Sequence, residues 1–216
     1  MNKIIAITVS TNYSDLLEFI LPQNYKFFYK WYIITSENDQ KTIDVINKLQ
    51  KENIEIIFYD FYKSFSYKSS SIFNKGGAIN YVQKLVYNIS ENIDKLILIL
   101  DSDIFLPDNF INIIDKINFV DNILYGPQNR YDYYSYNNFE SNLIDSKYSV
   151  GGFEGYFQLY KFNSRYLYNN SKDCSICDIT FRNKFKNKIT ISDLIVKHLG
   201  KGGVNWKGRK EIDFIK

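Results

Sequence analysis

The chain alternates short runs of aliphatic and aromatic residues with longer segments in which apolar and polar residues are mixed. Three β-rich runs, at 3–9, 31–35 and 54–59, each end in a cluster of polar residues. Helical spacing follows the first two runs; within 42–51, for example, every third position is aliphatic. Because strands that alternate with helices form parallel βαβ units, the pattern predicts an α/β fold.

The strongest strand signal lies in the middle of the chain. Leu96–Leu100 is a run of aliphatic residues that leads directly into Asp101 and Asp103. A short, continuous apolar run predicts a strand buried on both faces, and the carboxyl ends of such strands collect ligands. Residues i and i+2 point to the same side, and two carboxylates held close together repel each other unless a cation is present. The pair therefore predicts a site for a hard divalent metal; a plain exposed acidic turn is the alternative.

The remaining segments are assigned by the same signals of periodicity, glycine and proline. They are a helix capped by Ser14 with Pro22 near its end, a helix from Lys75 towards Ile89, a helix after Pro107, a strand over 122–126, a surface loop over 131–142, a glycine-punctuated turn at 151–155 entering a strand, a helix over 173–185, and a final strand over 189–198 that Asp193 interrupts.

Composition and charge exclude several classes. The 216 residues suit one domain, and 45% hydrophobic with 24% charged residues is a globular composition. A net charge of +3 with scattered cations gives no sign of nucleic-acid binding. No apolar run approaches the roughly 20 residues that span a bilayer, and 3–9 is too short for a signal peptide. We therefore expect a cytoplasmic protein without a membrane span. Cys174 and Cys177 are interpreted as small buried side chains rather than a zinc or redox pair.

The only histidine, His198, ends the last predicted strand. A late strand-terminal histidine together with Asp-x-Asp suggests Asp101, Asp103 and His198 as ligands of one Mn²⁺ or Mg²⁺. Carboxylates suit both ions, and an imidazole favours Mn²⁺. Such an ion would bridge a substrate diphosphate and neutralise charge on the leaving group. A purely structural histidine is the alternative.

These residues, taken in order, resemble a known family. Asn12, Asp60, the run Lys75-Gly76-Gly77-Ala78-Ile79-Asn80, Asp101-Ser102-Asp103 and His198 resemble the nucleotide-diphospho-sugar transferase fold. Within it the chain is similar to family-2-like GT-A glycosyltransferases, whose pattern includes K-G-x-A-x-N before the D-x-D strand. The resemblance covers nearly the whole chain. It implies a single GT-A domain over 1–216, with a Rossmann-like, mostly parallel twisted sheet flanked by helices, a nucleotide-sugar-binding half (1–115) and an acceptor half (116–216).

The resemblance also implies roles for individual residues. Asp103 would bind the metal with His198, while Asp101 would contact the ribose or the sugar. The other donor-binding candidates are Thr8, Ser10 and Asn12 in the nucleotide pocket, Asp60 on the base, Lys75 and Asn80 on the sugar-nucleotide, Ser102 between the two aspartates, and Lys201, Trp206 and Arg209 in a C-terminal segment that closes over the diphosphate.

The acceptor half departs from the family pattern. Many relatives carry an acidic pair at a helix start, followed by an aspartate and a downstream arginine; here Asp178 and Arg182 fit the end of that pattern, and the acidic pair is absent. Inverting transfer needs a carboxylate that takes the acceptor hydroxyl proton. Asp178 is the predicted base, with Glu154 as its competitor. The alternative for Asp178 is a surface ion pair with Arg182.

Together these expectations describe a metal-dependent, inverting glycosyltransferase of the hexosyltransferase type. It would move a sugar from a nucleotide donor, UDP-sugar rather than GDP-sugar, to a hydroxyl of a glycan or other acceptor. Two alternatives stay open: a non-catalytic sugar-nucleotide-binding module, and a nucleotidyltransferase on a related fold. A nucleotidyltransferase is expected to carry a glycine-rich basic loop directly after the first strand. This chain has Ser10-Thr11-Asn12-Tyr13 there and lacks such a loop.

Overall fold

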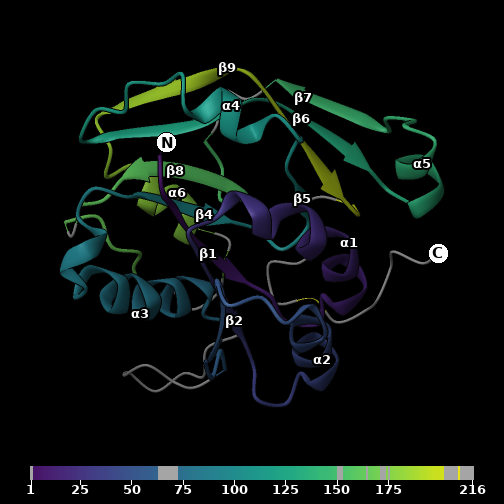
Figure 1. Ribbon diagram of the computed structural model, residues 1–216. Coiled ribbons are helices and arrows are strands. Elements are labelled where there is room, and N and C mark those ends of the chain that lie inside the picture. Colours follow the sequence, from purple (N-terminus) through teal and green to yellow (C-terminus); the bar gives the residue numbers. More distant parts are fainter. Residues whose placement is uncertain are drawn as a thin grey trace.

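The computed structural model describes residues 2–62, 73–149, 153–163, 165–170, 174, 176–201 and 209. Within them the chain folds into one mixed α/β domain with a curled sheet and flanking helices (Figure 1). In chain order the elements are β1 (Ile4–Val9), α1 (Ser14–Asn24), η1 (Tyr25–Phe27), β2 (Lys30–Thr35), α2 (Gln40–Leu49), β3 (Ile54–Phe58), α3 (Lys75–Tyr87), η2 (Ser90–Asn92), β4 (Leu96–Leu100), β5 (Ile104–Phe105), α4 (Phe110–Ile114), β6 (Ile123–Tyr133), α5 (Tyr136–Glu140), β7 (Ser146–Ser149), β8 (Phe157–Lys161), α6 (Cys177–Arg182) and β9 (Asn187–Leu199).

The first half of the domain is the parallel βαβ arrangement that the sequence predicts. Strands β3, β2, β1 and β4 lie side by side in that order, and every pair among them is parallel. In the register, Ile7 of β1 lies between Tyr32 of β2 and Ile99 of β4. Because the strands are parallel, their carboxyl ends meet at one edge of the sheet. Asp101 therefore emerges at the same edge as the residues that follow β1 and β3.

The second half is built differently, and the expectation of a mostly parallel sheet is wrong there. The sheet continues as β4-β8-β6-β9-β5, with β7 beside β6. Of these contacts only β6 with β9 is parallel; the pairs β4–β8, β6–β8, β6–β7 and β5–β9 are antiparallel. Parallel neighbours need long crossovers, usually through a helix. The described helices of this half have only five or six residues, and most of its strands pair antiparallel.

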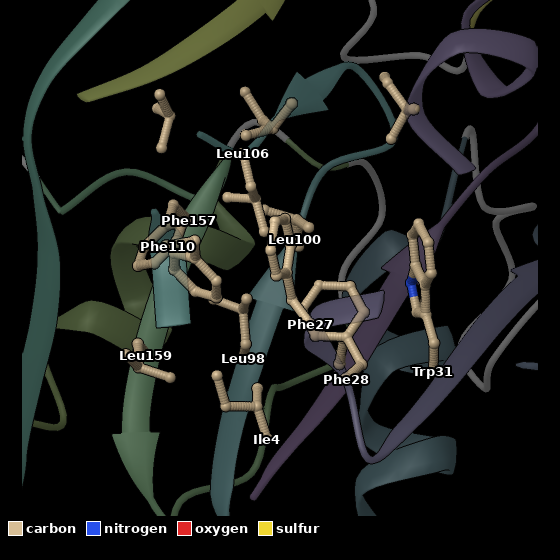
Figure 2. Close-up of a cluster of buried hydrophobic side chains, with 14 of the residues drawn as sticks. Ile4, Phe27, Phe28, Trp31, Leu98, Leu100, Leu106, Phe110, Phe157 and Leu159 are labelled. Atoms are coloured by element: carbon tan, nitrogen blue, oxygen red, sulfur yellow. The ribbon is translucent and has the colours of Figure 1, made fainter. Parts of the chain in front are cut away.

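Side chains alternate between two hydrophobic clusters on opposite faces of the sheet. Leu96, Leu98 and Leu100 join the cluster beneath α1, and Ile97 and Ile99 join the one beneath α3. Figure 1 shows α1 and α2 on one side of the parallel strands and α3 on the other. Figure 2 shows the first cluster, in which side chains of β4 and β8 pack against phenylalanines from η1 and α4. The prediction that β4 is buried on both faces is confirmed.

Three local predictions are wrong. The segment 131–142 is not a surface loop: β6 runs to Tyr133, which is fully buried, and α5 follows. The alternation of polar and aromatic side chains there belongs to a strand, because one face packs inward. The described part of 173–185 forms a helix only over Cys177–Arg182. Ser14 lies inside α1 and makes no capping hydrogen bond, since Tyr13 occupies the cap.

Asp193 marks an irregularity in the last strand, as predicted, but β9 continues through it as one strand. Asp193 has a φ of +66°, and the pairing of β6 with β9 shifts register between Pro127 and Asn129. The shift lets β9 continue to His198 and Leu199 beside β6. No helix in the described part of the chain has the length and apolarity that a membrane crossing requires.

Candidate active site at the carboxyl edge of the sheet

The structure brings Asp103 and His198 together, as predicted. Strand β5 begins directly after Asp103 and pairs antiparallel with β9, with Ile104 opposite His198. The Leu199 amide donates to the Asp103 carbonyl at 2.8 Å, which fixes the two backbones. Imidazole Nε2 then lies 3.4 Å from Asp103 Oδ2, and both side chains are almost fully buried.

Each partner of this pair changes the protonation of the other. Burial alone would lower the pKa of His198, but the Asp103 carboxylate raises it to about 9. Burial would raise the pKa of Asp103, and the histidine instead holds it below its ordinary value. Each side chain therefore favours the charged form of the other. Asp103 Oδ1 is buried and has no hydrogen-bond partner among the described residues, so one acceptor oxygen is left to a ligand.

On the other side of the imidazole lie two residues that the sequence did not reveal. Asp132 of β6 stands directly opposite His198 in the parallel register, and its Oδ1 lies 3.4 Å from imidazole Nδ1. Arg130, two residues earlier on the same face, donates from Nε to Asp132 Oδ1 at 2.8 Å. Assigning 131–142 to a surface loop concealed Asp132, and Arg130 lies just before that segment. The available signal was the i, i+2 spacing of an arginine and an aspartate between aromatic residues.

A second charged cluster is centred on Lys75, the first residue of α3. Its Nζ lies 2.8 Å from Asp101 Oδ1 and 3.3 Å from Asp178 Oδ2. Burial alone would lower the pKa of Lys75, but the two carboxylates raise it well above the ordinary value. Burial raises the pKa of Asp101 to about 6, against the lowering effect of the Lys75 ammonium. Lys75 is thus a buried cation that joins the end of β4 to α6.

The contacts of Asp178, the predicted base, were not predictable from the sequence pattern that identified it. The Tyr168 hydroxyl donates to its Oδ1 at 3.1 Å, and the Gln158 amide donates to its backbone oxygen at 3.3 Å. A Cβ on Gly155 would lie 1.9 Å from the carboxyl carbon of Asp178, so this approach requires glycine. The side chain is 21% exposed, which leaves the carboxylate open to a substrate. Glu154, the competing candidate, is exposed in the same turn.

The described residues offer a divalent metal two protein ligands, and water or substrate oxygens would complete its coordination. Among the described residues, no three His, Cys, Asp or Glu side chains are arranged to hold a metal ion. Asp101 is paired with Lys75, which leaves the Asp103 carboxylate and the His198 imidazole as the ligand pair. Oxygen and nitrogen ligands of this kind suit Mn²⁺, and Mg²⁺ also commonly binds through few protein ligands plus substrate phosphates. The full set of Asp101, Asp103 and His198 stays a prediction.

At the end of β1, two of the predicted donor residues bind each other. The Asn12 side-chain amide donates to the Arg209 carbonyl at 2.7 Å, and Arg209 Nη1 donates to the Asn12 carbonyl at 3.1 Å. Arg209 also forms a forked ion pair with Asp15, with Nη2 2.8 Å from Oδ2. Asn12 itself has a φ of +61° and donates its backbone N–H to Asp39. Arg209 therefore lies against the end of β1, where the resemblance implies a nucleotide pocket.

The other predicted donor residues are scattered between core and surface. Thr8 is fully buried and its hydroxyl accepts the Trp31 indole N–H at 2.9 Å. The remaining candidates are placed as follows: Ser10 and Ser102 are buried, Asn80 donates its side-chain amide to the Tyr168 carbonyl, Asp60 and Lys201 are exposed, and Trp206 lies outside the described residues. Cys174 and Cys177 are small buried side chains, as interpreted, and burial raises the pKa of the Cys177 thiol.

Comparisons with known proteins give only distant likenesses. No protein-family model and no curated protein sequence matches the chain. It is similar to a solved structure of 4-diphosphocytidyl-2C-methyl-D-erythritol synthase, at 11% identity over 94% of this chain and 90% of that chain, with a TM-score of 0.49. It is similar to mouse xyloside xylosyltransferase 1 at 12% identity over 76% of this chain and 68% of that chain, with a TM-score of 0.41. It is also similar to mannose-6-phosphate isomerase from Helicobacter pylori at 12% identity over 91% of this chain and 97% of that chain, with a TM-score of 0.43. Similarity this weak carries no argument about activity, so the proposal below rests on the site.

Proposed function

We propose that the protein is a metal-dependent glycosyltransferase that uses a nucleotide-diphospho-sugar, UDP-linked rather than GDP-linked, and a hydroxyl acceptor. One observation carries the proposal. Two different polar sites adjoin at the end of β4: Asp103 faces His198, and Asp101, two residues before it, faces Lys75 and Asp178. A site for a leaving diphosphate and a site for proton removal are the two parts that such a transfer needs.

On the donor side, Asp103 and His198 would hold the divalent ion, which when bound neutralises the charge of the departing nucleoside diphosphate. Asp103 Oδ1 supports this assignment, because no described residue donates to it and a buried carboxylate oxygen without a donor is costly unless a ligand occupies it. Asp101 would accept hydrogen bonds from the ribose or sugar hydroxyls. Its Lys75 partner fixes the orientation in which the carboxylate does so.

On the acceptor side, Asp178 would act as the general base. As the acceptor oxygen bonds to the anomeric carbon, its proton passes to an Asp178 carboxylate oxygen. The bond from the anomeric carbon to the diphosphate oxygen breaks, and the diphosphate keeps the electron pair. One displacement from the opposite face inverts the anomeric configuration. Tyr168 and the close backbone of Gly155 hold the base in place, so little reorganisation is needed during transfer.

Isothermal titration with UDP and with GDP, each in the presence of Mn²⁺, tests the donor assignment. We expect UDP to bind, with GDP weaker, and we expect binding of UDP to weaken when Asp103 is changed to asparagine. Asp94→Asn is the matched control, because Asp94 is an exposed aspartate just before β4. Failure of the wild-type protein to bind either nucleotide in the presence of Mn²⁺ would remove the donor assignment.

A further inference from the structure

The imidazole of His198 is held between two carboxylates that come from different strands. β9 lies between β5 and β6 in the sheet. Asp103, just before β5, lies 3.4 Å from Nε2, and Asp132 of β6 lies 3.4 Å from Nδ1. Each ring nitrogen therefore has its own acidic neighbour, and the two neighbours occupy opposite sides of the ring.

The two carboxylates differ in what else they contact. Asp132 is 1% exposed and takes two hydrogen bonds from Arg130, at 2.8 Å from Nε and 3.3 Å from Nη2. The guanidinium is itself held over the rings of Tyr148 and Tyr156, at 4.7 Å from each centroid. Asp103, by contrast, keeps one oxygen without a hydrogen-bond partner among the described residues. Asp132 thus has a rigid, charge-compensated setting, and Asp103 has room for a ligand.

From this geometry we infer that Asp132 is a positioning residue for His198. It holds Nδ1–H and so presents Nε2 to a divalent cation shared with Asp103; the inference rests on the proposed metal-dependent function. A histidine that ligates a metal through one nitrogen commonly donates the other N–H to a carboxylate, which fixes the ring and raises its strength as a ligand. Among the described residues Nδ1 has no hydrogen-bond partner, and Asp132 Oδ1 lies 3.4 Å from it, so a small rotation of the ring would complete this bond.

The competing explanation is that the four side chains are only a buried ionic cluster that joins β5, β6 and β9. Arg130, Asp132, His198 and Asp103 form an alternating series of positive and negative groups when the imidazole is protonated. A cluster of that kind would affect the melting temperature when one member is removed. It would not govern which imidazole nitrogen binds a cation, or how tightly the cation is bound.

Two measurements separate these explanations. The first is the affinity for Mn²⁺ alone, read from the loss of the free-ion electron paramagnetic resonance signal. We expect Asp132→Asn to weaken binding by about 10-fold and Asp132→Ala by up to about 100-fold, since asparagine keeps an acceptor but not its charge. The control is Asp145→Asn, whose carboxylate accepts the Tyr134 amide near the end of β6 without touching His198, and it should match the wild type.

The second is ¹⁵N nuclear magnetic resonance of the histidine-labelled wild-type protein with Zn²⁺ as a diamagnetic probe. The chain has one histidine, so its ring signals need no further assignment. We expect Zn²⁺ on Nε2 and a proton on Nδ1, a result that does not depend on any variant folding. Metal on Nδ1, equal Mn²⁺ affinity in all variants, or no metal binding by the wild type would each overturn the inference. Transfer activity is measured separately, so a loss of the proposed function with retained Asp132-dependent Mn²⁺ binding would leave this inference standing.

Discussion

Replacing Gly155 with alanine is the most specific test of the assignment of Asp178 as the base. The new methyl carbon would lie 1.9 Å from the Asp178 carboxyl carbon and about as close to both carboxylate oxygens, at 2.0 and 2.4 Å. Contacts of this kind below 3.0 Å are essentially never found, so the two groups must separate by about 1 Å. The turn at Gly155 is anchored to the end of β4 through the hydrogen bond from Asp101 N–H to the Tyr156 carbonyl at 3.1 Å. The side chain of Asp178 is therefore the group that moves.

The displacement should cost activity more than stability. A misplacement of about 1 Å at a reacting group can reduce the rate by roughly 100-fold. The carboxylate would also leave the Tyr168 hydroxyl and Lys75, its hydrogen-bond and ion-pair partners. Overpacking of a buried site costs about 1–3 kcal/mol. Because the Asp178 side chain is 21% exposed and can swing towards solvent, we expect the lower end of that range.

The assay compares the turnover of donor and acceptor with the melting temperature of the same preparation. Gly126→Ala is the control, because its Cβ would meet the ring of Phe153 at 2.7 Å, a smaller overlap that also lies below 3.0 Å and involves no carboxylate. That variant should lose stability and keep its turnover per folded molecule. A folded Gly155→Ala protein that turns over within about threefold of the wild type would refute the placement of the base.

Lys75, His198 and the end of α2 each allow a further test. Lys75→Met leaves Asp101 and Asp178 without their shared cation, so we expect a lower melting temperature at pH 8. The deficit should shrink as the pH falls towards 6, because the pKa of Asp101, about 6 beside Lys75, rises further without the ammonium and the variant takes up its proton at a higher pH than the wild type. Without added metal, the pKa of His198 is raised from 6.5 to about 9. The stability contributed by its pair with Asp103 is therefore complete below pH 6.5 and is lost as the pH rises through about 9. Chemical denaturation across that range should show this decline in the free energy of unfolding, and His198→Gln should abolish the decline. Gln50 ends α2 in the left-handed conformation with a φ of +47°, so Gln50→Gly should raise the free energy of unfolding by about 0.5–1 kcal/mol in urea titrations, and an unchanged or lower value would contradict this.

The parallel half of the fold is predictable from sequence for a physical reason. Leu96–Leu100 is buried on both faces, so every position must be apolar, and the acidic residues at its end mark where the chain leaves the sheet. The second half resists such reasoning, because its longest strands, β6 and β9, mix buried and exposed positions and carry polar residues among the apolar ones. In β6, Tyr133 is buried while Gln128 is exposed, and polar residues such as Arg130 and Asp132 lie on an inner face because they satisfy one another.

The residues of the candidate site also fall into those that the sequence identifies and those that it does not. Asp103 and His198 were identifiable because each ends or adjoins a strand with a clear apolar pattern. The partners Asp132, Tyr168 and Gly155 were not identifiable, since their roles depend on which strands become neighbours: β6 beside β9, and β8 beside β4. Pairings between segments far apart in the chain are set by tertiary packing rather than by local periodicity. Lys75 lies between these cases: the motif identified it, but its two carboxylate partners emerge only from the fold.

The central claim is that the chain transfers a sugar from a nucleotide-diphospho-sugar by means of the two polar sites at the end of β4. Its most direct test is to incubate the protein with Mn²⁺ and a panel of UDP- and GDP-sugars, with UTP and CTP plus sugar phosphates in parallel, and to measure nucleoside diphosphate and pyrophosphate release. We expect release of UDP from at least one UDP-sugar, and we expect Asp103→Asn and Asp178→Asn to abolish it. Pyrophosphate release from a nucleoside triphosphate, or no release from any donor, would contradict it.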